Sequence, residues 1–289
     1  MEKDEYVEKP DGVRKHLWDY SIDLIGPGDR AKQQIEACRK AGISIYMKSE
    51  PELAFEAPRL SHVPCMDRWV DRAESLAACG ADGAWVFPAF RPNYGTPPAE
   101  VNQLVWWNPA PSKDAALDAL AARIAGNNAG SHLRNAWRYV SEAIPFSPEI
   151  PPYYTGPYYL GPAHPMCVDP DAKLPEVFYG QYLFLAEMSD SEGLPPRPTF
   201  FTEARGNVPV FLRMYREMEA KLKSAAEEID AAKNDVPERC KLMFDSEASA
   251  IRWFYHTARA HANFYESCLL RDALRGFAKS ETKTPEQLE

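Results

Sequence analysis

The sequence lacks the patterns that mark a membrane, a nucleic acid or a secretory pathway. No apolar run reaches the roughly 18 residues that a membrane-spanning helix needs, and residues 1–5 form a charge cluster without the apolar core of a secretion signal. Basic residues are outnumbered by 33 to 42, the net charge is −9, and no basic stripe stands out. We therefore expect a cytoplasmic protein with neither a membrane nor a nucleic acid as partner.

Signatures of a metal or a bound cofactor are also missing. The six cysteines are scattered singly, with no Cys-x-x-Cys pair and no histidine at ligand spacing beside them. His256 and His261 are five residues apart in an expected helix, so they face different directions and would not chelate a metal together. No glycine-rich phosphate loop and no nucleophile elbow follows an expected strand. We expect no metal, no cofactor and reduced thiols.

The N-terminal third of the sequence contains a succession of apolar runs and helical segments that end at glycine. After a polar lead-in at 1–12, we expect strands at 16–22, 43–49 and 83–90 and helices at 29–41 and 66–79. Strands that alternate with helices in this way indicate βαβ units and a parallel sheet. Residues 13–110 are therefore predicted to form a partial, TIM-barrel-like β/α region with three βα units.

The remainder, 111–289, is predicted to be helical. Helices are expected at about 112–124 and 128–144, and the proline- and tyrosine-rich stretch 145–175 is expected to be a long loop. Within 207–279, apolar residues recur every three or four positions over many turns, which indicates a long antiparallel helical hairpin. The fold class is thus α/β followed by α.

Carboxylates cluster where the first two expected strands end. Glycoside hydrolysis needs two carboxyl groups roughly 5–10 Å apart, and we choose Asp19, Glu50 and Glu56 as catalytic candidates. Asp19 lies between aromatic residues and Glu56 follows Phe55, settings that partly desolvate a carboxylate. Each of these acids can equally be a capping or surface residue.

Aromatic side chains lie at expected strand ends, in the loops after them and in the proline-rich loop. Sugar rings stack their C–H faces on such rings. The predicted substrate-binding residues are Trp18, Glu52, Trp85, Phe90, Tyr94, Tyr158 and Tyr159. A core position for Trp85 is the alternative, whereas the tyrosines of the proline-rich loop would need partners for their hydroxyls if they were all buried.

Several of these motifs resemble one family. The stretch Trp18-Asp19-Tyr20-Ser21, the Lys48-Ser49 strand end followed by Phe55-Glu56, and the loop at 94–98 are similar to the C-terminal half of bacterial glycoside-hydrolase-like (β/α)₈ barrels, distantly hexosaminidase-like. The resemblance covers roughly residues 11–170. It implies a carbohydrate ligand, without naming the sugar, and a helical domain after the barrel.

The expected strand count departs from that family. A closed barrel has eight strands in about 250 residues, whereas three strands are expected here. We therefore expect a truncated or split barrel that an N-terminal half-barrel, encoded upstream, would complete. One hypothesis is a glycoside hydrolase that is active once completed. The alternative is a non-catalytic carbohydrate-binding or protein-interaction module.

Overall fold

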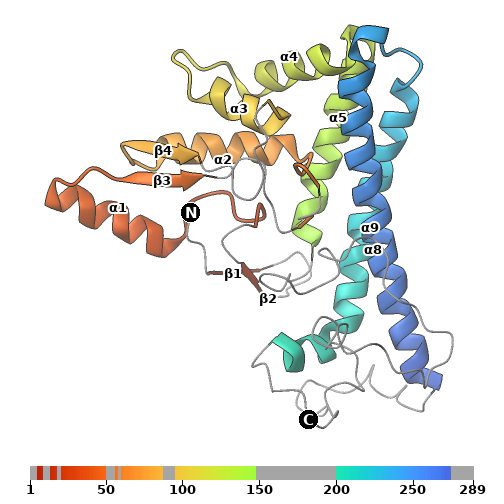
Figure 1. The fold of residues 1–289 in the computed structure, drawn as a ribbon. Helices are drawn as coiled ribbons and strands as arrows, with labels where there is room; N and C mark the ends of the chain where they lie inside the picture. The colour runs from red at the N-terminus through yellow and green to blue at the C-terminus, as the bar shows by residue number, and fades with distance from the viewer. Residues whose placement is uncertain are drawn as a thin grey trace.

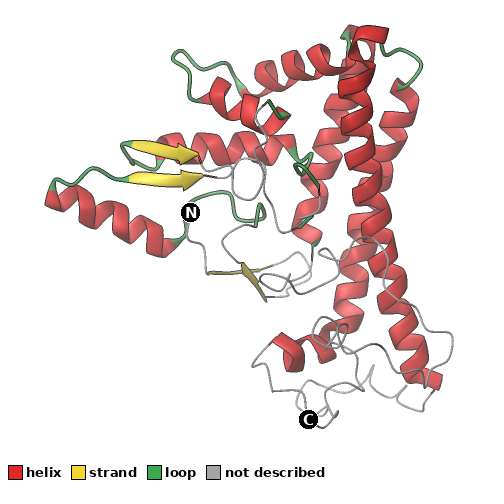
Figure 2. Cartoon of the chain, in the orientation of Figure 1, coloured by secondary structure: helices red, strands yellow, loops and turns green. Residues whose placement is uncertain are grey.

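A computed structural model describes residues 5–8, 14–17, 21–49, 56–57, 60–86, 95–147 and 200–274. Within these ranges the chain is mostly helical, with one short parallel strand pair and one short antiparallel pair (Figure 1 and Figure 2). The prediction of a helix-rich fold with a small parallel sheet is confirmed at this coarse level. A complete set of barrel units stays a prediction.

The first two strands correct the expected topology. β1 (Glu5–Glu8) lies inside the predicted polar lead-in, and β2 (Arg14–Leu17) begins two residues before the predicted strand at 16–22. The two pair antiparallel, with Glu5 opposite Leu17. The intervening sequence contains Pro-Asp-Gly, which favours a tight turn and so a hairpin. Hence β2 pairs with β1, and the parallel sheet of the described residues has two strands instead of three.

The parallel pair is a βαβ unit. β3 (Tyr46–Ser49) runs into the connection that leads to α2 (Met66–Ala78), and α2 returns the chain to β4 (Gly83–Val86). The strands are parallel, with Tyr46 opposite Gly83 and Lys48 opposite Trp85. α1 (Asp29–Ala41) precedes β3 and ends at Gly42, whose φ of 67° is the left-handed conformation expected after a helix.

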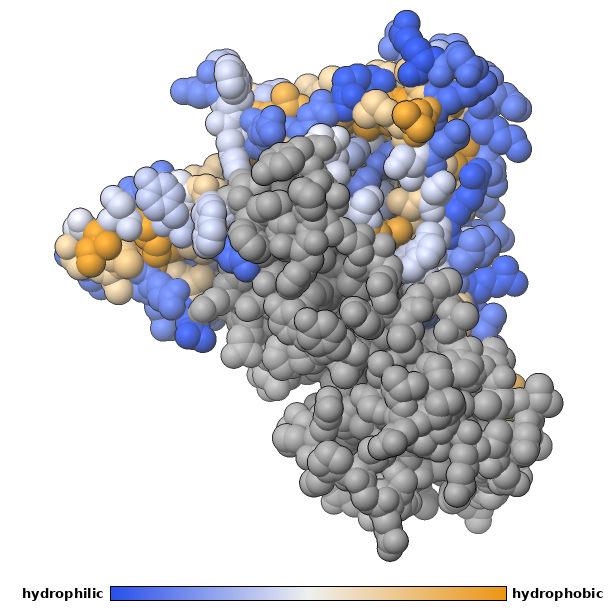
Figure 3. All heavy atoms as spheres, in the orientation of Figure 1, coloured by the Kyte–Doolittle hydropathy of each residue, from blue (hydrophilic) through white to orange (hydrophobic). Residues whose placement is uncertain are grey.

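The helices cover one face of this pair and leave the other face open. Met47 packs with Ile35 of α1 and Leu76 of α2. Side chains alternate along a strand, so Tyr46 and Trp85 belong to the opposite face, where they are 65% and 59% exposed. Apolar residues also reach the surface where α1 leads into β3 (Figure 3).

Three shorter helices continue the chain. α3 (Pro97–Val105) occupies a stretch that was expected to be a loop, because Thr96 accepts a hydrogen bond from the backbone of Ala99 and Pro97 fits the first helical turn. α4 (Lys113–Ala125) begins at Ser112, which caps it as expected. α5 (Asn127–Ala143) and a short 3₁₀ turn, η1 (Ile144–Phe146), follow.

Two long helices complete the described part. α8 (Phe200–Ala232) and α9 (Lys241–Leu274) lie side by side (Figure 1), and the 3₁₀ turn η3 (Glu238–Cys240) lies in their short connection. Ion pairs join Arg252 to Asp230 near this connection and Arg216 to Glu266 farther along, so the two helices run in opposite directions.

Within the described residues, the larger of two apolar clusters joins α2 to the helices that follow it. Most of its fully buried members come from α2, α4, α5, α8 and α9; examples are Trp69, Leu117, Trp137, Leu222 and Phe254. Burying a large apolar side chain contributes about 1.5–3 kcal/mol, so this shared core fixes α2 firmly against the bundle. Within the described ranges, no helix combines the length and the apolar character needed to cross a bilayer.

Candidate functional site

Glu56 is the predicted acid that the structure places in most detail. Its side chain is fully buried, and both oxygens accept hydrogen bonds: Oε1 from the hydroxyl of Ser21, and Oε2 from the backbone N–H of Ile22 at 3.1 Å. The Ser21 hydroxyl in turn accepts a bond from the backbone N–H of Asp23 at 3.1 Å. Glu56 thus holds the segment 21–23 in place.

Arg68 of α2 holds the same segment from the other side. Its Nε donates to the carbonyl of Ile22 at 2.9 Å, and its Nη2 donates to the carbonyl of Asp23. Burial lowers the pKa of Arg68, and the charge of Glu56 counteracts this shift. The carboxylate and the guanidinium therefore stabilise each other beside a loop that neither could fix alone.

Cys65, at the start of α2, lies in the field of the same two charges. Burial raises the pKa of its thiol well above the ordinary range; Arg68 lowers it, and Glu56 adds to the rise. A thiol held protonated in this way is a poor nucleophile. Cys65 is therefore not a candidate nucleophile in this part of the site.

The open face of the parallel pair presents two aromatic rings. A Cβ at Gly83 would lie 2.7 Å from a ring atom of Tyr46, so the Tyr46 ring covers this glycine. Trp85 follows two residues later on the same face and is more than half exposed. The core alternative for Trp85 is therefore wrong. Tyr46 was missed, although its place in an alternating strand was a sufficient signal.

The other predicted site residues cannot be compared with this geometry. Outside the described residues lie Trp18, Asp19, Glu50, Glu52, Phe90, Tyr94, Tyr158 and Tyr159. The structure does fix Ser21 and Ile22, two and three positions after Asp19 in the sequence, through their contacts with Glu56. The catalytic roles of Asp19, Glu50 and Glu56 stay predictions.

A buried polar chain that the sequence did not suggest links three distant segments. Nδ1 of His62 lies 3.2 Å from the Ser61 hydroxyl, and Nε2 of His62 lies 2.7 Å from Oε1 of Glu247 on α9. Oε2 of Glu247 accepts a hydrogen bond from the indole N–H of Trp137 on α5 at 2.9 Å. His62 and Glu247 are separated by 185 positions in the sequence, and no local sequence pattern predicts such a pair.

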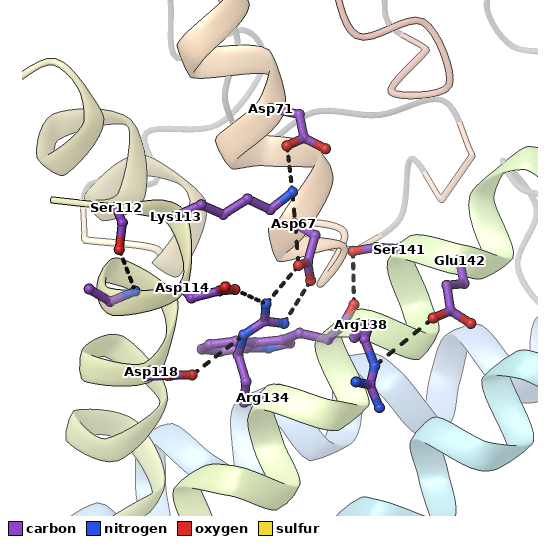
Figure 4. Close-up of polar contacts among 12 residues, drawn as sticks. Asp67, Asp71, Ser112, Lys113, Asp114, Asp118, Arg134, Arg138, Ser141 and Glu142 are labelled. Atoms are coloured by element: carbon purple, nitrogen blue, oxygen red, sulfur yellow. Dashed lines mark hydrogen bonds and ion pairs between the residues drawn. The ribbon is translucent and has the colours of Figure 1, made fainter. Parts of the chain in front are cut away.

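A second polar network joins α2, α4 and α5 (Figure 4). Arg134 makes a two-pronged contact with Asp67 at 2.8 and 2.9 Å and reaches Asp114 at 3.2 Å, while Lys113 pairs with Asp71. Burial opposes the positive charge of Arg134, but its bonds with Asp67 and Asp114 outweigh burial and raise its pKa. Two basic side chains, Lys113 and Arg134, are held here by four carboxylates, those of Asp67, Asp71, Asp114 and Asp118. Because the network joins three helices, its role is structural.

Comparison with known proteins gives no relative. No family model, curated protein or solved structure matches this chain. The function must therefore be argued from the chain's own residues.

The described residues contain no group of three or more His, Cys, Asp and Glu side chains that could hold a metal ion. His256 is exposed and His261 is fully buried, which confirms that they face different directions. Nδ1 of His261 lies 2.6 Å from the carbonyl of Thr257, and burial lowers the pKa of His261 to about 3. His261 is therefore a neutral core residue.

Proposed function

We propose that this chain binds carbohydrate through a glycoside-hydrolase-like site beyond the C-terminal ends of β3 and β4. The observation that carries the proposal is the position of Glu56, which follows β3 and lies beside the start of α2, next to Cys65 and Arg68. In parallel β/α folds, ligands and catalytic groups gather on this side of the sheet.

In this proposal Glu56 is a positioning residue. Both of its oxygens are occupied and no part of it is exposed, so it does not reach a sugar directly. Its role is to fix Ser21 and Ile22, the segment that follows the predicted site residues Trp18 and Asp19 in the sequence.

The exposed aromatic face supports a sugar ligand and a partner. Tyr46 and Trp85 offer ring faces on the side of the strands opposite the helices, which in a closed β/α barrel is the interior. We propose that an upstream-encoded half-barrel completes the sheet along the edges of the β3–β4 pair. Trp85, one residue before the end of β4, would then lie near the mouth of the barrel. We further propose that hydrolysis of glycosidic bonds takes place only in the completed barrel. The chain alone then binds sugar without turnover.

Titration calorimetry against a panel of oligosaccharides tests the binding. Trp85→Ala is expected to weaken the affinity about two- to tenfold, since stacking on one ring contributes about 0.5–1.5 kcal/mol. Trp107→Ala is the matched control, because Trp107 is also an exposed tryptophan, at 73%, but lies beyond α3. Equal affinities for the two variants, or no sugar bound by the unaltered chain, would refute the proposal.

Turnover is tested with aryl glycosides, using the chain alone and the chain mixed with the product of the upstream reading frame. Glu56→Gln preserves the side-chain size and an acceptor for the Ile22 N–H, but its amide nitrogen then faces the Ser21 hydroxyl and the negative charge beside Arg68 is lost. Sugar affinity is therefore expected to fall with the loss of order at 21–23. Sugar binding that is unchanged in Glu56→Gln would remove the positioning role.

A further inference from the structure

The polar chain from Ser61 to Trp137 has a defined direction of hydrogen bonding. The indole N–H of Trp137 is only a donor, so Oε2 of Glu247 accepts its bond at 2.9 Å. An ionised carboxylate makes the strongest bonds when both oxygens accept. The proton between Oε1 of Glu247 and Nε2 of His62, 2.7 Å apart, therefore belongs to the imidazole.

This assignment fixes the opposite ring nitrogen. A neutral imidazole with its proton on Nε2 has an unprotonated acceptor at Nδ1. The hydroxyl of Ser61 lies 3.2 Å from that atom. Ser61 can therefore donate its proton to a base whose tautomer is set by a buried carboxylate.

Burial separates the two ends of the chain. The side chains of His62 and Glu247 are only 3% and 2% exposed, and Trp137 is fully buried, whereas Ser61 is exposed. The base is thus held rigidly in the core, and the hydroxyl is the member of the chain that a ligand can reach. A nucleophile, a base and a group that orients the base are the parts of a hydrolytic serine site.

We propose that Ser61 is an acyl-accepting nucleophile activated by His62, with Glu247 and Trp137 as positioning residues and small carboxylic esters as the substrate class. The Ser61 oxygen forms a bond to the acyl carbon while its proton moves to Nδ1 of His62. The ester C–O bond then breaks, and the leaving alcohol takes the proton from Nδ1. Water, deprotonated by Nδ1, next attacks the acyl carbon. The bond between the acyl carbon and the Ser61 oxygen breaks, Nδ1 returns its proton to that oxygen, and the carboxylic acid leaves. This activity does not depend on carbohydrate binding.

A fluorophosphonate probe tests the nucleophile directly. The unaltered chain is expected to form one covalent adduct with loss of fluoride, located at Ser61 by peptide mass mapping, and to release p-nitrophenol from p-nitrophenyl acetate. Ser61→Ala should lose both. Ser131→Ala, which removes an exposed serine on α5, should change neither. An adduct at another residue, or an unaltered chain that reacts no faster than Ser61→Ala, overturns the proposal.

Glu247→Gln tests whether Glu247 sets the position of the proton on the His62 ring or only supports the fold. The glutamine oxygen can accept from Trp137 and its amide can donate to Nε2 of His62, so the contacts persist while the ring proton moves to Nδ1. Labelling of Ser61 should then fall by about 10²–10⁴-fold, the usual contribution of a general base. Ring ¹⁵N shifts of His62 should report the exchanged proton. Labelling at the original rate in a folded Glu247→Gln chain would equally overturn the proposal.

Discussion

The contact of Glu247 with His62 and Trp137 predicts a large and specific loss of stability on truncation. Glu247→Ala leaves two buried donors, the His62 ring N–H and the Trp137 indole N–H, without their acceptor. Each unsatisfied buried donor costs about 1–3 kcal/mol, so the two donors together cost about 2–6 kcal/mol. We expect the free energy of unfolding to fall by about 4 kcal/mol, and by about 1 kcal/mol in Glu247→Gln, which keeps the same shape and an acceptor for Trp137.

Urea unfolding followed by far-ultraviolet circular dichroism measures both values, and a double-mutant cycle with Trp137→Phe tests their origin. Phenylalanine has no N–H to satisfy, so Trp137→Phe should cost about 1–3 kcal/mol less in the Glu247→Ala background than in the unaltered chain. The reasoning is refuted if Glu247→Ala costs less than about 1 kcal/mol or if the two substitutions are additive.

Three further predictions concern other parts of the described chain. Gly126→Ala should lower the free energy of unfolding by about 1–3 kcal/mol, because Gly126 has φ 86° and ψ 162° and an added Cβ would lie 2.6 Å from Pro237; a melting temperature within about 1 °C of the unaltered chain would contradict this. Burial lowers the pKa of His261 to about 3, so as the pH falls this histidine takes up a proton in the unfolded chain before it does in the folded chain. The free energy of unfolding therefore decreases as the pH falls from about 6.5 towards 3, by about 2 kcal/mol at pH 5. His261→Gln should show a smaller drop between pH 7 and pH 5 in urea titrations, and an identical drop would exclude His261 as its source. Arg134→Lys should cost about 1 kcal/mol through loss of the two-pronged contact with Asp67, measured as a shift in the urea midpoint; no shift would show that the contact adds nothing.

Local signals in the sequence were enough for most helices. Helices expected at 29–41, 66–79, 112–124 and 128–144 lie within two residues of α1, α2, α4 and α5, because apolar periodicity, glycine ends and the Ser112 cap act within one or two turns. α3 was missed because Thr96 followed by two prolines was interpreted as a loop, although threonine before proline is also typical of a helix start. Short strands were harder, since their partners decide whether they form.

The candidate site was predictable only in part. Glu56 was chosen from its place after an expected strand and Trp85 as an aromatic residue of another, and the structure shows what Glu56 contacts and that Trp85 is exposed. The pairing of His62 with Glu247 was out of reach, because it depends on how α9 packs against a segment 185 positions earlier. The spacing of His256 and His261 along one helix carries no information on such tertiary contacts.

The length of α9 gives its contact with His62 a mechanical meaning. The helix has 34 residues, so it is a rod of about 50 Å at 1.5 Å per residue. Glu247 lies near one end, and the other end lies about 40 Å away. A tilt of about 5° around Glu247 would therefore move the far end by roughly 3–4 Å. A shift of the segment around Ser61 that tilted α9 at the contact between His62 and Glu247 would therefore cause a larger displacement at the far end of this helix.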